Sequence, residues 1–335
     1  MIESIQFRNF RVLRDATLPL GRCTILVGPN GSGKTTVLQA IDLIREPNRL
    51  KYGRLVTLGV PPTKENMVEV RVNWGGDQAG AHFPTRWLPP AQVMRGTERT
   101  GRGDASNPER LDRQINRFRV FTLEARAIAA PATVTSQIEL GSDGANLAAV
   151  LDGIRDTEPG RFAAIDAELP QWLPEFDQIL FDTPSPGRKS IALRTRGAQH
   201  KVPAADLSQG TLIALALLTL AYLPEPPCLV GLEEPDRGIH PRLLRHVQDA
   251  IYRLAYPENF GEKREPVQVI ATTHSPYFLD LFRDHPEEVV VADKTGNEVK
   301  FEPLSQRSDI REILSEAPLG EAWYTGVLGG VPSEP

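Results

Sequence analysis

The segment VGPNGSGKTT, residues 27–36, has the composition and spacing of a loop that binds phosphate groups. Four residues separate Gly28 from Gly33, and Lys34 and Thr35 follow directly. The glycines let backbone N–H groups wrap a β-phosphate, the lysine reaches the β- and γ-phosphates, and the threonine hydroxyl can ligate Mg²⁺. The predicted ligand contacts of this loop are Asn30, Gly31, Ser32, Gly33, Lys34, Thr35 and Thr36.

Two adjacent acids follow an apolar run in the segment CLVGLEEPDRGIHP, residues 228–241. Ligands of α/β sheets bind at the carboxyl ends of the strands. Glu233 can therefore hold Mg²⁺ through water, and Glu234 can act as the catalytic base that takes a proton from an attacking water. The alternative is a solvated turn, but two acids after a buried strand are costly without a cation.

A histidine and a serine-glycine pair complete the set. In VIATTHSP, residues 269–276, His274 follows another apolar run and can contact a γ-phosphate; alone, it would be read as a core histidine or a cap. In LSQGT, residues 207–211, Ser208 and Gly210 stand before a long apolar stretch. They can begin a helix, and a helix N-terminus attracts an anion.

These residues need strands and helices to position them. Apolar strands that alternate with helices predict an α/β core. The expected strands include IESIQFRNF, CTILV, VEVRVNW, CLVGL and VQVIATT, and the expected helices include TTVLQAIDLI, GANLAAVLDGI and PRLLRHVQDAIYRLA. The segment VVVADKTGNEVKFEPL is expected to form a terminal hairpin, whereas residues 75–92, GGDQAGAHFPTRWLPPAQ, are expected to form a loop.

Composition fits an ordinary soluble protein of 335 residues, with a net charge of −5 and 40% hydrophobic residues. No overall basic field marks a nucleic-acid binder. Cys23 and Cys228 each lie in an apolar run, which predicts buried thiols in a reducing compartment. The apolar stretch 212–223 is too short to span a bilayer, so no membrane partner and a cytoplasmic location are expected.

The segment 95–126 is locally basic. Two interpretations stay open: a strip that contacts the phosphates of DNA, or a solvated face with ion pairs to Glu98, Glu109 and Asp112. The arginines considered for the strip are Arg95, Arg99, Arg102, Arg110, Arg113, Arg117 and Arg119.

The order of phosphate loop, LSQG, strand with two acids and strand with histidine resembles that of ABC-type ATPase heads. The opening IESIQFRNFRVLRDATLPL and the segments EEPDRGIHP, THSPYFLD and LGEAWYTGVLGGVP are similar to the RecF, SMC and OLD (overcoming lysogenization defect) branch, in particular its stand-alone bacterial ATPases. The resemblance is best over residues 1–42 and 205–282.

The resemblance implies a P-loop fold with a mixed central sheet flanked by helices, an N-terminal antiparallel β lobe and a middle insertion lobe. One head would comprise a nucleotide-binding core at 1–44 and 205–300, a middle lobe at 45–204 and a tail at 301–335. It also implies a homodimer with two ATPs between the heads, in which Ser208, Gln209 and Gly210 cap the γ-phosphate of the opposite subunit. Gln137 is the candidate for the family's metal-contacting Q-loop glutamine.

We find no sustained heptads of an SMC coiled coil, and no obvious acidic triplet of a Toprim nuclease after His274. We therefore expect an ATP- and Mg²⁺-dependent ATPase head that acts on nucleic acid, or on a separately encoded effector such as a nuclease, in DNA repair or antiviral defence. The alternatives are an ABC transporter subunit and a nucleotide-gated scaffold with negligible turnover.

Overall fold

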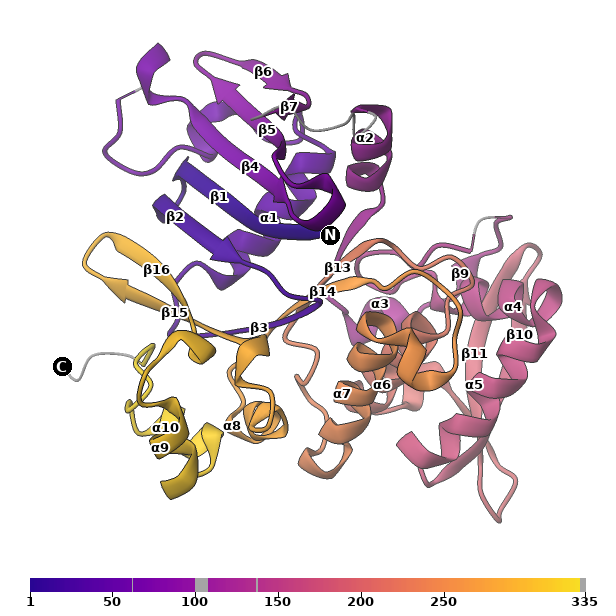
Figure 1. Ribbon diagram of the computed structural model, residues 1–335. Helices are drawn as coiled ribbons and strands as arrows, with labels where there is room; N and C mark the ends of the chain where they lie inside the picture. Colours follow the sequence, from indigo (N-terminus) through magenta and orange to yellow (C-terminus); the bar gives the residue numbers. More distant parts are fainter. Residues whose placement is uncertain (62, 100–107, 137, 332–335) are drawn as a thin grey trace. The chain divides into compact units, whose positions relative to one another are not determined.

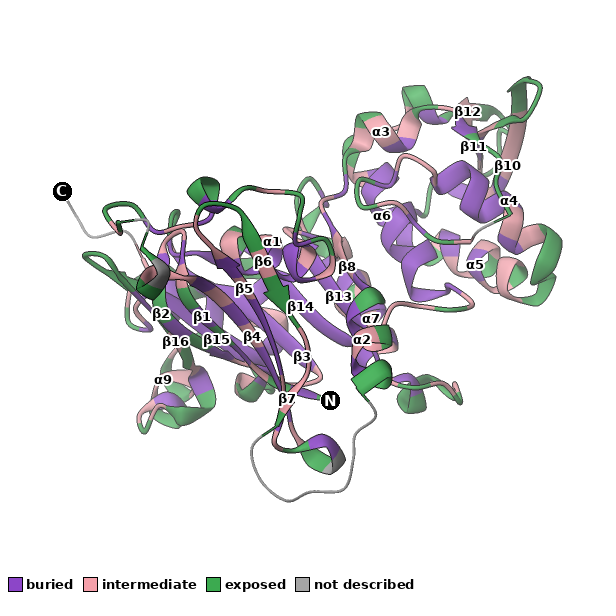
Figure 2. Ribbon diagram, turned by 90° about the horizontal axis from the view of Figure 1, so that it is seen from above, coloured by how far each residue is buried: buried purple, intermediate pink, exposed green. Residues whose placement is uncertain are grey.

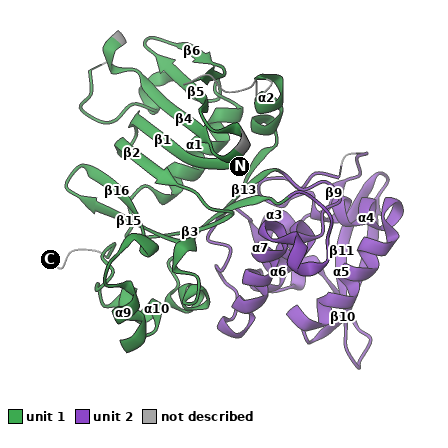
Figure 3. Ribbon diagram, in the orientation of Figure 1, with its two compact units in different colours: residues 1–120, 228–232, 266–335 green, residues 121–227, 233–265 purple. Residues whose placement is uncertain are grey.

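The computed structural model describes residues 1–61, 63–99, 108–136 and 138–331 of the chain (Figure 1). The chain forms two compact units, coloured separately in Figure 3. Unit 1 contains Met1–Val120, Cys228–Leu232 and Pro266–Pro335, and unit 2 contains Phe121–Pro227 and Glu233–Glu265. The division into core, middle lobe and tail that the resemblance implies stays a prediction.

The central sheet of unit 1 carries the expected phosphate loop. Its strand order is β16-β15-β3-β14-β13-β8, and β3 pairs in parallel with both β14 and β15. β15 pairs antiparallel with β16, so the predicted mixed sheet and the terminal hairpin are confirmed. The strands are β3 Cys23–Val27, β8 Phe118–Phe121, β13 Leu229–Glu233, β14 Gln268–Thr272, β15 Val289–Thr295 and β16 Glu298–Pro303.

The second sheet of unit 1 is antiparallel, with the order β2-β1-β4-β5-β6 and β7 paired to β5. This sheet confirms the predicted N-terminal β lobe. Its strands are β1 Ile2–Phe10, β2 Leu13–Pro19, β4 Val68–Trp74, β5 Ala81–Leu88, β6 Gln92–Arg95 and β7 Glu98–Arg99.

The expectation of a loop over residues 75–92 was wrong, because β5 lies within it. This strand contains Pro84, and proline cannot donate a ladder hydrogen bond. In the sheet, β6 pairs with β5 from Thr85 onward, and β7 pairs with Ala81 and His82. Pro84 therefore falls between β6 and β7 on one side of β5 and lies opposite Arg71 of β4 on the other.

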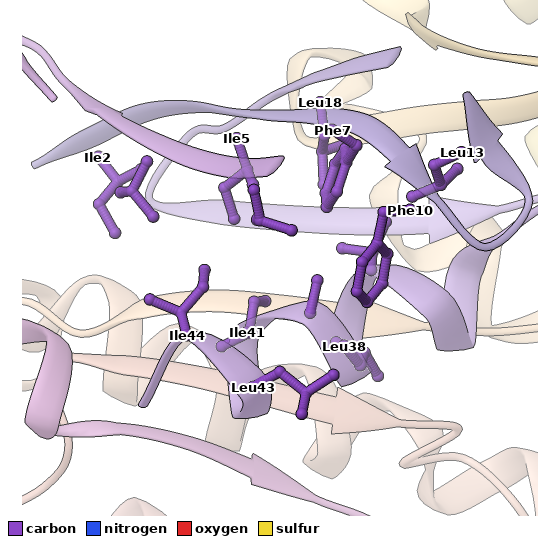
Figure 4. Packing of buried hydrophobic residues seen from close by; sticks show 14 of the residues in the cluster. Ile2, Ile5, Phe7, Phe10, Leu13, Leu18, Leu38, Ile41, Leu43 and Ile44 are labelled. Carbon is purple, nitrogen blue, oxygen red and sulfur yellow. The ribbon is translucent and has the colours of Figure 1, made fainter. Parts of the chain in front are cut away.

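Helix α1, Lys34–Arg45, packs its apolar side against the β lobe. Its buried residues include Leu38, Ile41 and Ile44, at the spacing of one helix face. Figure 4 shows Ile41 and Ile44 facing Ile5 and other buried side chains of β1 across a shared core. In Figure 2 the strands of this core are largely purple, the colour of buried residues. Each fully buried Ile, Leu or Phe stabilises the fold by about 1.5–3 kcal/mol.

A buried amide ties the N-terminal strand to β14. The Gln268 Oε1 atom accepts a hydrogen bond from the Ile2 N–H at 2.7 Å, and its Nε2 donates to the carbonyl oxygens of Ile2 at 2.8 Å and Gly21 at 3.0 Å. These bonds satisfy the amide in a dry environment. The other helices of unit 1 are α2 Pro108–Asn116, α8 Pro276–Leu279, α9 Ile310–Glu316 and α10 Leu319–Tyr324.

Unit 2 combines helices with a small antiparallel sheet. The sheet has the order β10-β11-β12, with β9 paired to β11, and α4 and α5 pack on it. Its strands are β9 Ala132–Thr133, β10 Phe176–Ser185, β11 Arg188–Thr195 and β12 Lys201–Pro203. Its helices are α3 Ala125–Ala129, α4 Leu147–Thr157, α5 Pro159–Trp172, α6 Gln209–Ala221 and α7 Leu244–Ala255.

Helix α6 is buried from Thr211 to Ala221, as its apolar sequence predicted. Next to its end, the Tyr222 hydroxyl donates to Glu168, and the Arg253 guanidinium lies 4.0 Å from the Tyr222 ring centroid. Burial and the hydrogen bond to Glu168 raise the pKa of Tyr222. This polar cluster holds α5, α6 and α7 together inside unit 2.

Both cysteines are free thiols. Cys23 is fully buried in β3, and desolvation together with the neighbouring Glu288 raises its pKa. Cys228 is half-buried and donates through Sγ to the Gln114 carbonyl at 3.0 Å, and burial raises its pKa to about 11. Within the described ranges, no helix is long and apolar enough to cross a membrane.

Candidate nucleotide-binding site

The predicted phosphate loop connects β3, whose five residues are all buried, to helix α1. Gly28 has φ +152°, and a Cβ atom there would lie 2.3 Å from the Ala292 carbonyl oxygen. Gly33 is the N-cap of α1 with φ +94°, a conformation that costs little only for glycine. The loop therefore turns tightly into α1, and the N-terminus of a helix attracts an anion.

Two side chains of the loop fit a phosphate ligand. Lys34 is buried, and its Nζ donates to the carbonyl oxygens of Gly28 at 2.8 Å and Pro29 at 2.9 Å, which holds its charge over the loop. The Ser32 hydroxyl is buried without a hydrogen-bond partner among the described residues. Because buried polar atoms are normally paired, this hydroxyl fits the role of a donor to a ligand oxygen. Three other expected contacts are exposed: Asn30, Gly31 and Thr35.

His274 lies at the same sheet edge as this loop. β14 runs parallel to β3, with Thr272 opposite Leu26, so both strands end toward the loop. His274 is half-buried, and the Ser275 side chain caps the short helix α8 by accepting from the Phe278 N–H at 3.2 Å. Unit 1 thus brings the phosphate loop and the predicted γ-phosphate contact to one edge.

The acid pair lies where β13 ends, in unit 2. The Glu233 Oε2 atom accepts a hydrogen bond from the Thr122 hydroxyl at 2.9 Å. Glu234 has φ +46°, in the left-handed region that non-glycine residues rarely adopt. Such strain costs about 1–3 kcal/mol and is concentrated at functional sites. The Arg237 N–H closes the turn on the Glu234 carbonyl at 3.0 Å, so the backbone fixes the direction of this acid.

The LSQG segment begins α6, as expected. Ser208 is the N-cap residue, and its Oγ accepts from the Thr211 N–H at 3.1 Å. A Cβ atom on Gly210 would lie 2.3 Å from the Gly238 carbonyl oxygen, so this position has no space for a side chain. Gly238 belongs to the turn that follows Glu234. Within unit 2, the LSQG loop therefore contacts the turn that follows the acid pair.

The remaining predicted positions are Gln137 and the arginines of the basic segment. Gln137 and Arg102 lie outside the described residues. Arg95 donates to the Ile44 carbonyl at 3.2 Å and lies 3.6 Å from an Asp112 carboxylate oxygen. Arg113 donates to the Glu109 carbonyl at 3.2 Å. Such internal bonds agree with the interpretation of a solvated face with ion pairs. The strip of arginines that contacts DNA stays a prediction.

Two cationic residues beside the loop were missed from the sequence. Arg11 has φ +52° and donates to the Gln39 side chain of α1, while the next residues, Val12 and Leu13, contact the Cβ position of Gly33. Lys294 Nζ lies 4.0 Å from the Cβ position of Gly31. A signal for Lys294 did exist, because it follows an apolar run in a strand parallel to β3, at the edge where ligands bind.

The glycine-rich loop after a central strand, the acids after β13 and the mixed sheet define a P-loop ATPase of the AAA/ABC type. The chain belongs to the family described as "AAA domain, putative AbiEii toxin, Type IV TA system", whose model matches residues 92–280. A second family model, "AAA ATPase domain", matches residues 1–75. These matches support ATP binding by this domain.

The relatives agree with the resemblance inferred from the sequence. The OLD nuclease of Thermus scotoductus is 26% identical over 393 aligned residues, which cover 97% of this chain and 69% of that protein. Among solved structures, an SMC head bound to the C-terminal winged-helix domain of ScpA is similar, with a TM-score of 0.62 and 13% identity, over 90% of this chain and 96% of that one.

The SMC head domain of Thermotoga maritima also matches, with a TM-score of 0.52 and 13% identity, over 90% of this chain and 98% of that one. At this identity the structural matches show the fold alone. The predicted fold class is thereby confirmed, and the similarity to the OLD nuclease agrees with the resemblance inferred from the sequence.

Proposed function

We propose that the protein is an ATP-hydrolysing switch whose heads close around two ATP molecules. The observation that supports hydrolysis is the conformation of Glu234. This acid is held in a left-handed, strained conformation directly after a buried strand. In the proposed reaction Glu234 takes the proton of the attacking water, and His274 contacts the γ-phosphate.

The loop residues bind and orient the nucleotide. Lys34 and the N–H groups at the start of α1 stabilise the phosphate charge. Mg²⁺, when bound, would neutralise charge on the β- and γ-phosphates, and Thr35 and Glu233 supply the hard oxygen ligands that it prefers. The Thr122 hydroxyl orients Glu233 for this role.

Closure of two heads is supported by the position of the LSQG loop. Ser208 and Gln209 are exposed at the N-terminus of α6, where an anion is stabilised. Their contact with the turn after Glu234 would link the phosphate of one subunit to the catalytic acid of the other. ATP would favour the closed dimer, and loss of the γ-phosphate would release it.

Light scattering with and without Mg-ATP tests the dimer. Glu234→Gln should retain ATP and accumulate as a dimer, whereas Ser208→Arg should stay monomeric because a bulky side chain occupies the phosphate position. Gln199→Arg, on an exposed turn of unit 2, is the matched charge control and should still dimerise. An unchanged mass of Glu234→Gln at saturating Mg-ATP would show that LSQG is only a helix cap.

We further propose that the switch serves defence or DNA repair, with DNA and a separately encoded effector such as a nuclease as partners. The family description names a putative toxin, and the relative from Thermus scotoductus is called a nuclease. Charge reversal of Arg110 and Arg113, both exposed on α2, should weaken DNA binding and reduce its salt dependence. Unchanged affinity and salt slope in a binding titration would remove the arginine strip.

A further inference from the structure

Residues 319–330, named here the bridging segment, contact both elements that carry the site of unit 1. The segment contains α10 and the turn that follows it. At its first end, the Gly320 N–H donates to the Asp280 Oδ1 atom at 2.6 Å. A Cβ atom on Gly320 would lie 2.1 Å from the carbonyl oxygen of Pro276. Pro276 is two residues from His274, so no side chain fits between α10 and the histidine segment.

The other end of the bridging segment reaches the phosphate loop. Gly330 has φ +62°, and a Cβ atom there would lie 2.6 Å from Val291 Cγ1. The same Cβ position lies 3.5 Å from the Gly28 Cα atom, at the start of the loop, and 3.5 Å from the Ala292 carbonyl oxygen. The Ala292 carbonyl is also the atom against which Gly28 itself packs. The segment therefore shares one close-packed contact with the loop.

Hydrogen bonds fix the turn of the bridging segment just before Gly330. The Arg307 guanidinium forms a two-point ion pair with Asp309, at 3.0 and 2.8 Å. It also donates to the carbonyl oxygens of Leu328 at 3.3 Å and Val327 at 3.4 Å. Leu328 is buried, which anchors the turn on its other side. The segment is thus held at Gly320, at the turn of Val327 and Leu328, and at Gly330.

We infer that the bridging segment is a positioning element that sets the spacing between the phosphate loop and His274. Close-packed contacts transmit displacement rather than absorbing it. A shift at Gly330 moves the loop and therefore changes nucleotide affinity. A shift at Gly320 moves the His274 segment and therefore changes turnover. The inference has two halves. The turnover half, the effect of Gly320 on hydrolysis, rests on the proposed function, whereas the affinity half, the effect of Gly330 on the Kd, requires only that the protein binds ATP.

Two adjacent glycines provide a matched pair for the test. Gly329 has φ +73° and no heavy atom within 4 Å of its Cβ position. Gly329→Ala and Gly330→Ala therefore impose similar backbone strain, but only the second creates a collision. ATP affinity is measured by equilibrium titration below both unfolding transitions. We expect the Kd to rise about tenfold in Gly330→Ala and less than about twofold in Gly329→Ala. Equal Kd values in the two variants would overturn the affinity half.

A second substitution that removes the colliding side chain should rescue ATP binding. Val291→Ala with Gly330→Ala should restore an ATP affinity close to that of Val291→Ala alone, because the 2.6 Å collision is gone. Where Gly330→Ala does not fold, Arg307→Ala releases the same turn, and an unchanged Kd in that variant would equally overturn the inference.

Gly320→Ala tests the other end. It should lower kcat about tenfold, through misplacement of His274, and change the Kd for ATP by less than about twofold. If the wild-type protein binds ATP but does not hydrolyse it, the proposed hydrolysis is refuted. The comparison of Gly329→Ala with Gly330→Ala would still test the affinity half. An unchanged kcat in Gly320→Ala would refute the turnover half alone.

Discussion

In unit 1 the residues expected to bind phosphate lie in close-packed backbone, whereas in unit 2 the residues expected to act on phosphate are exposed or strained. Gly28, Ser32 and Lys34 are buried, and a Cβ atom at Gly28 would collide with its neighbour. Ser208 is exposed at a helix end, and Glu234 is held in a left-handed turn. Under the proposed function, nucleotide binding would be preorganised within unit 1, while unit 2 would hold groups that act only when a phosphate reaches them.

The largest expected effect comes from unit 1. Lys34→Ala removes the charge that the loop holds over the phosphates, so ATP binding and turnover should both be lost. ATP at 100 times its Kd should stabilise wild type by about 2.7 kcal/mol, and this variant far less. Thermal unfolding with and without Mg-ATP measures the difference. Lys300→Ala, on exposed β16, is the control and should keep the wild-type shift; equal shifts in Lys34→Ala and wild type would contradict the preorganised loop.

A substitution of Glu234 in unit 2 should change the free energy of unfolding and the rate of hydrolysis in opposite directions. Glu234→Gly relieves the left-handed strain, so the free energy of unfolding should rise by up to about 1 kcal/mol while turnover is lost. Chemical denaturation and single-turnover hydrolysis measure the two effects. Gln199→Gly is the matched control, because Gln199 also lies in unit 2 with φ +50°. It should gain similar stability and keep its turnover. Wild-type hydrolysis by Glu234→Gly would remove this acid from the mechanism.

The smallest expected effect concerns Lys294, beside Gly31. Its Nζ can interact with a phosphate bound in the loop, and an exposed charge pair contributes about 0.2–1 kcal/mol. Lys294→Ala should therefore raise the Kd for ADP about two- to fivefold at low salt, with a smaller effect at high salt. A titration at two ionic strengths provides the measurement, again with Lys300→Ala as control. A Kd that does not change at either salt would exclude Lys294 from the site.

Local patterns in the sequence predicted the elements and the motif positions. The buried β3, the amphipathic α1 and the all-apolar α6 each carry the periodicity of the element they form. Glycine spacing placed the loop, and acids after an apolar run marked the end of β13. These features depend on neighbouring residues, so they can be read from one chain.

Long-range contacts could not be read in the same way. β5 was taken for a loop, because its pairing with β4, β6 and β7 is visible only in the folded sheet. The left-handed turn at Glu234 depends on the packing around it rather than on its own residue type. Likewise, Gly330 lies beside Gly28 although some 300 residues separate them in the sequence.

The low reactivity expected of the two native thiols has a practical consequence: the approach of two heads can be followed by fluorescence. Cys23 is fully buried with a raised pKa, and the Cys228 pKa of about 11 leaves about one thiolate in ten thousand at pH 7. Maleimide dyes react with thiolates, so the native chain should remain nearly unlabelled under mild conditions. A single cysteine introduced at an exposed surface position would then carry the dye without replacement of either native cysteine, and energy transfer between two labelled copies would report their approach directly.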